Sequence, residues 1–385
     1  MTAASPTDFA IALNDLIASI PARSAEFEAM RRIPDDVIAQ MRSAGIFKMF
    51  VPEEHNGLEL DLPEIIDAVR RLSCADASVG WTTMIGAGSA LFATMLPREA
   101  FQSIYGVDEN AIIAGSTQLL GVIEQRGGVW HGKGRWPFAS GCHHATWMLG
   151  FCRLVTEGDE AGPHKVRVVV LPADRWTILD TWHVPGLKGS GSDDIVLNTP
   201  LDPEIDIFDI EGTQPWQKGP LYAGVPHMIA LLHAAVSLGI AQGALNDLLA
   251  IAASGRRQQR AAAPMRDTEA FQRDLGKVHA DIRAAEAVLQ NQTQSHWQHA
   301  QNQTLATDAL LVEGSQSAIW VVNQCRRAVD ELFALGGSAV MYDSSPLQRR
   351  LRDIHMAAQH NLMQPRHFVK SGKLLVETFE SAGVH

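Results

Sequence analysis

The sequence has few cysteines, little basic charge and no long apolar run, and each shortage argues against a class of protein. Its four cysteines, Cys74, Cys142, Cys152 and Cys325, form no CxxC pair, so we expect neither a disulfide framework nor a zinc site; this usage is typical of a reducing cytoplasm. A formal net charge of -11 argues against a nucleic-acid or anionic-membrane partner, which would need a basic surface. No apolar run reaches the roughly 18 to 20 residues that a membrane helix requires. No HExxH motif or carboxylate cluster organises the fifteen histidines, so no metal site is expected.

What is present is a change of hydrophobic period along the chain. In residues 1–108, apolar residues recur three and four apart, as at Val37 and Met41, which predicts an N-terminal α-helical domain. In residues 109–214, short β-branched or aromatic runs are broken by Gly, Asp and Pro, which predicts a central β domain, an antiparallel sheet or small barrel. The helical period returns in residues 215–385 as four long stretches, which predicts a C-terminal four-helix bundle. The expected fold class is therefore α+β with three domains.

Turn-forming residues mark the ends of several predicted elements. Gly45 follows the first periodic helix and is a typical helix stop, while Gly127-Gly128 stands where a tight hairpin needs positive φ. Gly336-Gly337 ends the third helical stretch of the bundle. Ser345-Pro346 begins the fourth, with serine as the cap and proline at the first helical position.

One short stretch, GRWPFASGCHHATW at residues 134–147, gathers aromatic rings, a hydroxyl group and two histidines. In a strand, alternation would place Trp136, Phe138 and Ser140 on one face. Such a face suits a planar heteroaromatic ligand, which would pack on the rings and bond the hydroxyl. The same pattern also fits a sheet core with a satisfied serine, and these residues alone leave both interpretations open.

Several motifs resemble the acyl-CoA dehydrogenase fold over nearly the whole chain. They are IFKMFVPEEHNG, GGVWHGKGRWPFASG, GLKGSGSDDIVL and FALGGSAV with LQRRLRDIH. Within that fold, FASGCHHATW and GLKGSGSDD are most similar to two-component flavin-dependent monooxygenases. The resemblance implies an N-terminal helical domain, a central antiparallel β-barrel, a C-terminal four-helix bundle and a homotetramer.

The resemblance also implies an activity. Such a chain is the oxygenase component, which takes reduced FMN or FAD from a separate NAD(P)H:flavin reductase. It reacts with O2 through a C4a-hydroperoxyflavin and oxygenates an aromatic, polycyclic or heteroaromatic small molecule. The sequence contains no GxGxxG fingerprint that opens a helix, which agrees with a separate reductase because this chain would not bind NAD(P)H itself.

Site residues follow from the resemblance position by position. Phe138 stands where an aromatic residue lies against the isoalloxazine, and Trp136 shares its expected face. Ser140 stands where a Ser or Thr bonds the flavin near N5, and it is a candidate catalytic residue for that reason. Ser116 resembles a hydroxyl that lines the flavin and substrate site.

A second set of residues resembles the part of the family that holds the flavin phosphates. Gly336 and Gly337 match a glycine pair that approaches the flavin dinucleotide of a neighbouring subunit. Arg256, in ASGRRQQR, corresponds to an arginine that holds flavin phosphate.

The last helical stretch separates the dehydrogenases from the monooxygenases. The commonest dehydrogenases carry a glutamate base eight residues after the aspartate of an Arg-Asp pair, and here that place after Arg352-Asp353 is Asn361. An amide cannot abstract a proton. One residue earlier is His360, where the monooxygenases have a histidine that stabilises the hydroperoxide; an imidazole can donate and recover a proton near neutral pH. Pro365 should end or kink the helix just after it. A merely packed histidine fits the sequence as well.

The substrate side is suggested by Trp81 and Ser89. Phenol-hydroxylating members carry a histidine eight residues after a tryptophan like Trp81, and here that residue is Ser89. A serine can hydrogen-bond a substrate but cannot act as a base near pH 7, which puts simple phenolate hydroxylation in doubt. The small residues around Ser89 either leave room for a fused-ring substrate or allow close helix packing.

Two other functions stay open at this point. One is an acyl-CoA dehydrogenase-type FAD oxidoreductase acting on a thioester, with its base elsewhere, for example Asp247. The other is a non-catalytic flavin-binding or helical assembly protein that kept the fold.

Overall fold

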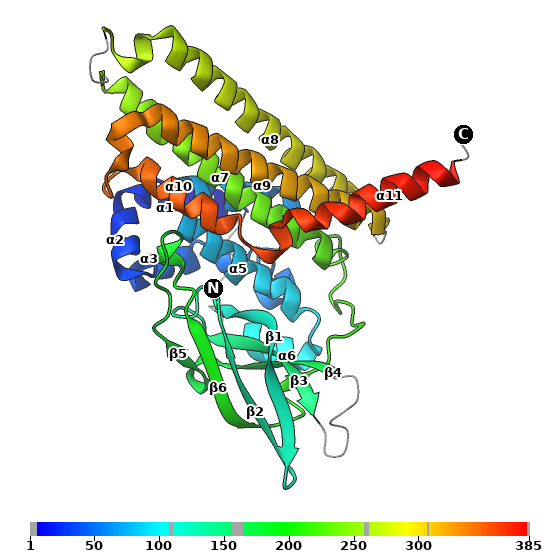
Figure 1. Cartoon of the computed structure of the whole chain (residues 1–385). Coiled ribbons are helices and arrows are strands. Elements are labelled where there is room, and N and C mark those ends of the chain that lie inside the picture. The colour runs from blue at the N-terminus through cyan, green and yellow to red at the C-terminus, as the bar shows by residue number, and fades with distance from the viewer. Residues whose placement is uncertain (1–5, 108–110, 156–164, 258–261, 306–307, 383–385) are drawn as a thin grey trace.

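The computed structural model describes residues 6–107, 111–155, 165–257, 262–305 and 308–382, and it places one sheet beneath a layer of long helices (Figure 1). The N-terminal helices lie between the sheet and those long helices. They are α1 (Pro6–Ser19), α2 (Ser24–Met30), α3 (Asp35–Ser43), α4 (Leu62–Ala75), α5 (Ala77–Ala93) and α6 (Arg98–Tyr105).

Helices α4 and α5 come from what the sequence presents as one helical stretch. Asp76 breaks it, because its backbone is extended and its carboxylate accepts the N–H groups of Ser78 and Val79 at 2.9 and 3.2 Å. The break turns α5 so that it packs on both α7 and β1. The predicted stop at Gly45 is confirmed, since its φ is 77°.

The sheet is mixed and open, which corrects the predicted antiparallel barrel. Its seven strands are ordered β5-β6-β2-β1-β3-β4-β7, and the edge strands β5 and β7 do not pair in the described residues. Strands β1 and β3 run parallel. The bounds are β1 (Ile113–Arg126), β2 (Val129–Trp136), β3 (Trp147–Val155), β4 (Lys165–Pro172), β5 (Thr177–Leu179), β6 (Asp194–Leu201) and β7 (Ile207–Phe208).

The pairing of β1 explains where the aromatic stretch goes. The two-residue turn at Gly127-Gly128, with φ of 58° and 83°, sends β2 back antiparallel to β1, as predicted. Strand β3 then pairs on the other side of β1 in the parallel sense. The connection 137–146 must therefore cross the first residues of β1, and there it meets the helices.

The C-terminal helices are organised around α7, which packs against α4, α5, α8, α9 and α10. By length and composition α7 could cross a membrane, so the expectation that no segment is apolar enough is wrong for it; however, 83% of its apolar window is buried in the fold, as in a core helix. The bounds are α7 (Val225–Ala253), α8 (Glu269–Gln301), α9 (Asp308–Gly336), α10 (Pro346–Ala357) and α11 (Phe368–Ser381).

The last predicted helix is broken into two. Helix α10 ends at Ala357, two 3-10 turns follow, and α11 then projects from the body (Figure 1). The predicted stop of α9 at Gly336 is confirmed. The predicted domain boundary after residue 108 lies outside the described residues.

The apolar core has two parts, and the smaller one lies within the sheet. Trp136 is fully buried there against Trp176, with ring centroids 5.4 Å apart. Its indole fills the space above Gly121, Gly134 and Gly150, where an added Cβ would come within 2.1 to 2.8 Å of the ring. The larger part joins the helices to the opposite side of the sheet.

Candidate active site

The stretch after β2 is a loop rather than a strand, so the predicted alternation is wrong. Pro137 cannot extend the ladder, and β2 ends at Trp136. The Trp136 ring points into the sheet core with no exposed surface, and its Nε1 donates to the carbonyl of Phe151 at 3.0 Å; the predicted contact of Trp136 with a flavin therefore does not fit. Phe138 adopts φ 64° and turns outward, leaving 59% of its surface exposed.

Ser140 faces a group of buried hydroxyls instead. Its Oγ lies 2.7 Å from the Oγ of Ser192, which in turn lies 2.7 Å from the Oγ of Ser190. The Ser190 hydroxyl donates to the carbonyl of Leu187 at 2.7 Å. All three serines are buried. The GLKGSGSDD motif thus supplies a hydrogen-bonded support for Ser140.

Helix α10 holds the loop that carries Ser190 and Ser192 in place through Asp353. The carboxylate of Asp353 accepts the N–H of Leu187 at 2.6 Å. Asp353 is buried, and burial together with the nearby charge of Asp76 raises its pKa to about 7. The aspartate of the Arg-Asp pair therefore serves to position the serine loop.

A second contact joins the two loops at Cys142, His143 and Asp193. The Nε2 of His143 lies 2.7 Å from Asp193 Oδ2, and the other oxygen of Asp193 accepts the N–H groups of Thr181 and Trp182 at 2.7 Å. The ligand atoms of the three residues lie within 4.8 Å of one another, close enough for a metal ion. Their hydrogen bonds give the group a structural role in holding residues 137–146.

Trp81 connects Ser140 to the helical side of the site. Its Nε1 donates to Ser140 Oγ at 3.0 Å. The same indole contacts His233 and His360 in T-shaped arrangements, with ring-centroid distances of 5.3 and 5.9 Å. The structure therefore brings together Ser140, Trp81 and His360, three residues that the sequence predicts for one site.

His360 lies after α10 and caps the turn η8 (Asn361–Met363). The helix ends three residues before it, earlier than Pro365 predicts. Its Nδ1 accepts the N–H of Leu362 at 3.4 Å, so the proton of the neutral ring is on Nε2. Burial lowers its pKa to about 4, which keeps the ring neutral at pH 7. The expected exchange of a proton near neutral pH is therefore corrected: at pH 7 the ring can only donate or accept hydrogen bonds.

His233 is a site residue that the sequence analysis missed. It lies on α7, 3% exposed, and its ring stacks on that of His360 with centroids 4.0 Å apart. Its Nδ1 has no hydrogen-bond partner among the described residues, and burial lowers its pKa, with a further contribution from His360. The available signal was a polar residue in the otherwise apolar run HMIALLHAAV, which also fits a packed histidine.

Ser89 and Ser116 make hydrogen bonds within their own elements rather than to this cluster. Ser89 is half-buried on α5, about 12 Å along the helix from Trp81, and its hydroxyl donates to the carbonyl of Ile85 at 2.8 Å. Ser116 is buried at an irregularity in β1, where its Oγ accepts the N–H of Gln118 at 3.4 Å. Their assignment to substrate or flavin stays a prediction.

The predicted phosphate-binding residues meet at the other end of α7. Arg256 donates to the hydroxyl of Ser338, which follows Gly336-Gly337, at 3.4 Å. Helix geometry places the end of α7 about 30 Å from His233. Within one chain, Arg256 and the glycine pair therefore belong to a site separate from Ser140 and His360.

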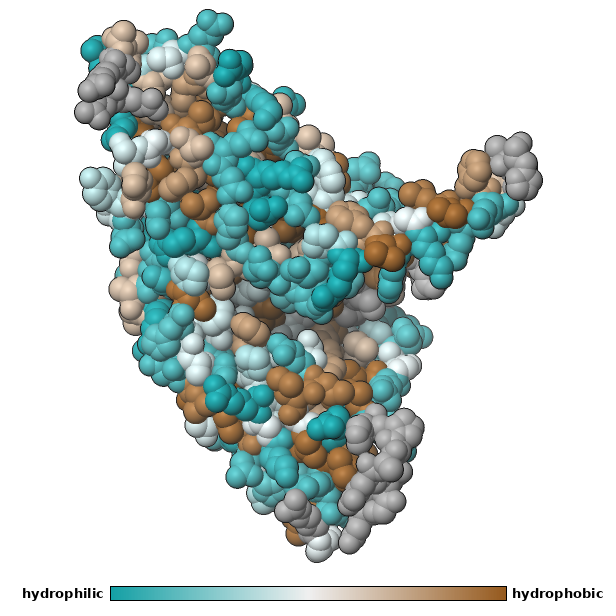
Figure 2. All heavy atoms as spheres, viewed as in Figure 1, coloured by the Kyte–Doolittle hydropathy of each residue, from teal (hydrophilic) through white to brown (hydrophobic). Residues whose placement is uncertain are grey.

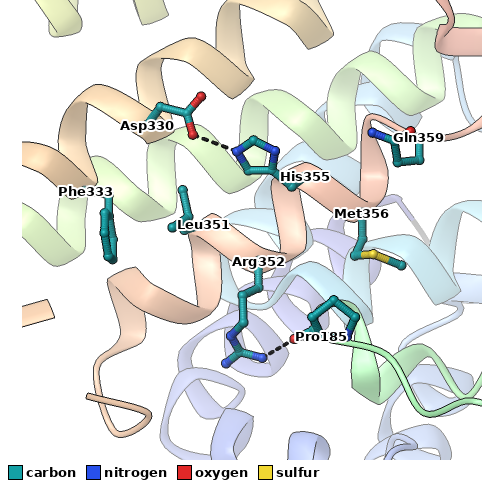
Figure 3. A pocket seen from close by; sticks show the side chains of 8 residues that line it. All are labelled: Pro185, Asp330, Phe333, Leu351, Arg352, His355, Met356 and Gln359. Atoms are coloured by element: carbon teal, nitrogen blue, oxygen red, sulfur yellow. Dashed lines mark hydrogen bonds and ion pairs between the residues drawn. The ribbon is translucent and has the colours of Figure 1, made fainter. Parts of the chain in front are cut away.

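A surface cavity of about 560 Å³ lies between α9 and α10 and excludes His360 (Figure 3). His355 bonds Asp330 at 2.7 Å on its wall, and Arg352 donates to the carbonyl of Pro185. Its lining residues are Pro185, Asp330, Phe333, Leu351, Arg352, His355, Met356 and Gln359.

Asp247, the candidate base of the dehydrogenase alternative, is already engaged. Its carboxylate pairs with buried Arg350 at 3.2 Å. Arg350 also donates to the carbonyls of Ser73, Cys74 and Ala75. This contact joins α7, α10 and the end of α4 and gives Asp247 a structural role.

Comparisons with known proteins agree with this geometry. Residues 16–100 match the family described as Acyl-CoA dehydrogenase, N-terminal domain, and residues 231–365 match Acyl-CoA dehydrogenase, C-terminal domain. The chain is 30% identical over 351 residues to indole-3-acetate monooxygenase of Pseudomonas putida, covering 89% of this chain and 87% of that protein. The chain belongs to the flavin-dependent monooxygenases of the acyl-CoA dehydrogenase fold.

Two further relatives define its place in the family. The oxygenase component of p-hydroxyphenylacetate 3-hydroxylase from Acinetobacter baumannii is 26% identical, over 90% of this chain and 84% of that protein. The structure of XiaF from Streptomyces sp. in complex with FADH2 and glycerol superposes with a TM-score of 0.84 at 25% identity, covering 93% of each chain. This monooxygenase is thus an oxygenase component, which implies a flavin reductase as its partner, and its relatives use reduced flavin.

The residues around Ser140 fit a flavin. Ser140 Oγ accepts one hydrogen bond from Trp81 and keeps capacity for a further polar contact, while Phe138 presents an exposed ring two residues away. His360 adds an Nε2–H donor beside the rings of Trp81 and His233. Trp136, by contrast, belongs to the sheet core.

Proposed function

We propose that this monooxygenase oxygenates an aromatic or heteroaromatic substrate, with the ring of reduced FMN or FAD held between Ser140 and His360. The observation that carries this proposal is Trp81, which bonds Ser140 with its Nε1 and contacts His360 with its ring. When bound, the flavin supplies the electrons that activate O2. The relatives are named for the substrates indole-3-acetate and p-hydroxyphenylacetate, which supports an aromatic substrate here.

The residues of this chain divide the work between binding and proton control. Ser140 orients the flavin through its hydroxyl, and Phe138 offers a ring for packing. His360 is neutral at pH 7 and would hold its proton on Nε2, from which it can donate a hydrogen bond to a negatively charged oxygen beside it. The buried rings of Trp81 and His233 shield one side of His360 from water, which would otherwise favour hydrogen peroxide over product.

Ser89 and Ser116 are assigned to the substrate side, where each offers a lone pair or a hydroxyl for a polar substituent. A serine cannot remove a phenolic proton near pH 7. Ser89 therefore favours a fused-ring substrate that needs no deprotonation. The aromatic contact of Phe92 with Phe151, at 6.0 Å, extends the apolar surface of α5 beyond Ser89.

The test is isotope incorporation. The chain is mixed anaerobically with reduced FMN or FAD, and buffer containing ¹⁸O2 and a panel of indoles, phenols and fused heteroaromatics is added. We expect one ¹⁸O atom in a product from at least one fused-ring compound. Formation of hydrogen peroxide alone with both flavins and the whole panel would contradict the proposal.

We further propose that the chain assembles as a homotetramer through its last helix and the end of α9. Helix α11 exposes Val369, Leu375, Val376 and Phe379, which lie along its length as an apolar face (Figure 2). The surface cavity adjoins the glycine pair, since Phe333 precedes Gly336 by one turn. A neighbouring subunit's flavin dinucleotide would reach this end of the bundle.

Light scattering tests the assembly. We expect a tetramer for the native chain and smaller species for the double variant Val376→Glu, Phe379→Glu. The matched control Lys370→Gln also changes a charge on this helix, but on the side away from the apolar face, and should remain tetrameric. A native monomer, or a double variant as large as the native protein, would contradict the role of α11.

A further inference from the structure

The hydroxyls behind Ser140 form a chain with a fixed proton order. At one end, the indole N–H of Trp81 can only donate, and it donates to Ser140. At the other end, the carbonyl of Leu187 can only accept, and it accepts from Ser190. Between these ends stand the Ser140–Ser192 and Ser192–Ser190 contacts, each 2.7 Å long.

Counting protons gives the direction of every bond. Three hydroxyl protons must fill three bonds: Ser140 to Ser192, Ser192 to Ser190, and Ser190 to the carbonyl. The Ser190 hydroxyl donates to the Leu187 carbonyl, so it must accept its other hydrogen bond from Ser192. Ser140 must then donate to Ser192. Ser140 is left with no free proton and one free lone pair.

We propose that the chain Ser140–Ser192–Ser190 selects the reduced form of the flavin, because it leaves Ser140 able to accept a hydrogen bond but not to give one. Reduced flavin carries a hydrogen on N5, which can donate to Ser140. Oxidised flavin has only a lone pair on N5. This lone pair can accept a hydrogen bond from Ser140 only if a bond among the three serine hydroxyls is broken. This inference rests on the proposed function, which puts N5 at Ser140.

Because the three serine hydroxyls are buried, reversing the direction of their hydrogen bonds is costly. Ser190 and Ser192 are 0% and 2% exposed, so water cannot take over a lost partner. Asp353 holds Leu187 through its N–H, which keeps the terminal carbonyl in place. Ser190 and Ser192 are therefore specificity-determining residues that act through Ser140 without touching the flavin.

The test measures dissociation constants of reduced and oxidised FMN and FAD by anaerobic fluorescence titration, which needs no turnover. The informative variant is Ser190→Ala, which removes the hydroxyl that accepts the hydrogen bond from Ser192 but leaves Ser140 and Trp81 unchanged. Ser192 can then donate to Ser140, whose own proton is free for oxidised N5. We expect the ratio of oxidised to reduced dissociation constants to fall by about tenfold, through tighter binding of oxidised flavin.

Two further variants keep the test decisive. Ser192→Ala frees the Ser140 proton directly and should lower the ratio in the same direction, whether or not Ser190→Ala folds. Ser73→Ala is the control, because Ser73 is also a fully buried serine, but its hydroxyl donates to Val69 within α4. Its ratio should equal that of the native protein.

The outcomes separate the inference from the proposed function. If the native chain binds both flavin forms and neither serine variant changes the ratio, the inference is overturned while the flavin site stands. Equal weakening of both forms would likewise overturn it, since it indicates only a disturbed loop. If the native chain binds neither FMN nor FAD in any state, the proposed function itself fails.

Discussion

The two walls of the candidate site are built in opposite ways. On the sheet side, Ser140 stands at the end of a hydrogen-bonded chain in which every hydroxyl has a partner. On the helix side, His233 and His360 stack on each other, and His233 leaves its Nδ1 without a partner among the described residues. The sheet wall is fixed in orientation, as a binding surface requires. The helix wall keeps polar groups at a cost in stability, which is typical of residues retained for chemistry.

The largest effect should follow from removing the donor on the helix wall. In His360→Ala, product formation should fall by about 100-fold, the usual effect of removing one positioned hydrogen-bond donor, while hydrogen peroxide replaces product and flavin binding changes little. Oxygen consumption, peroxide and product are measured in the same reaction. The control is His355→Ala, which lies on α10 but bonds Asp330 at the surface cavity. Equal yields of product per O2 in His360→Ala and the native enzyme would remove His360 from the chemistry.

Removing the hydroxyl on the sheet wall should affect binding rather than coupling. Ser140→Ala leaves the Trp81 N–H without an acceptor and removes the hydrogen bond that Ser192 accepts, so we expect about tenfold weaker binding of reduced flavin and a loss of about 1–3 kcal/mol in unfolding free energy. Anaerobic titration and urea unfolding measure the two quantities. Ser89→Ala, whose hydroxyl bonds only its own helix, should leave flavin affinity unchanged. A normal flavin affinity in Ser140→Ala would place the flavin elsewhere.

The contrast between the walls also predicts a pH dependence of stability. The pKa of His360 is lowered to about 4 in the folded chain, below the 6.5 of an exposed histidine. The unfolded chain therefore binds the proton more readily, so the contribution of this residue is complete above pH 6.5 and is lost as the pH falls toward 4. Between pH 7 and 5, the native protein should lose about 2 kcal/mol more than His360→Gln. Urea unfolding at both pH values measures this; identical losses would show that the ring is already solvated.

The smallest effect is expected from the stacked partner. His233→Phe keeps an aromatic ring against His360 and removes the unpaired Nδ1, so the unfolding free energy should rise by about 1 kcal/mol. Coupling of O2 to product should fall at the same time. A variant that is less stable and fully coupled would show that His233 is an ordinary packed residue.

The sequence predicts local features better than long-range ones. The turn at Gly127-Gly128 and the stop of α9 at Gly336 depend on backbone preferences that a few residues carry. The parallel pairing of β1 with β3 depends on the crossing of residues 137–146, and no local pattern encodes it. That crossing is also why Trp136 enters the sheet core while Phe138 turns outward.

The same division applies to the site. Ser140 and His360 are found through the motifs that they share with the family. They are far apart in the sequence, and in the fold Trp81 contacts both of them. His233 could not be singled out, because a histidine within an apolar helix has the same sequence pattern whether it packs or reacts. Ser190 and Ser192 are visible in GLKGSGSDD, but their proton order depends on the Leu187 carbonyl and on Asp353, which only the fold brings together.

A crystal structure of the chain grown anaerobically with reduced FMN or FAD tests the central claim most directly. The account predicts the flavin N5 within hydrogen-bond distance of Ser140 Oγ, with the His360 Nε2 facing the same part of the ring. A flavin ring seated away from Ser140, for example in the cavity beside Phe333 and His355, would contradict it.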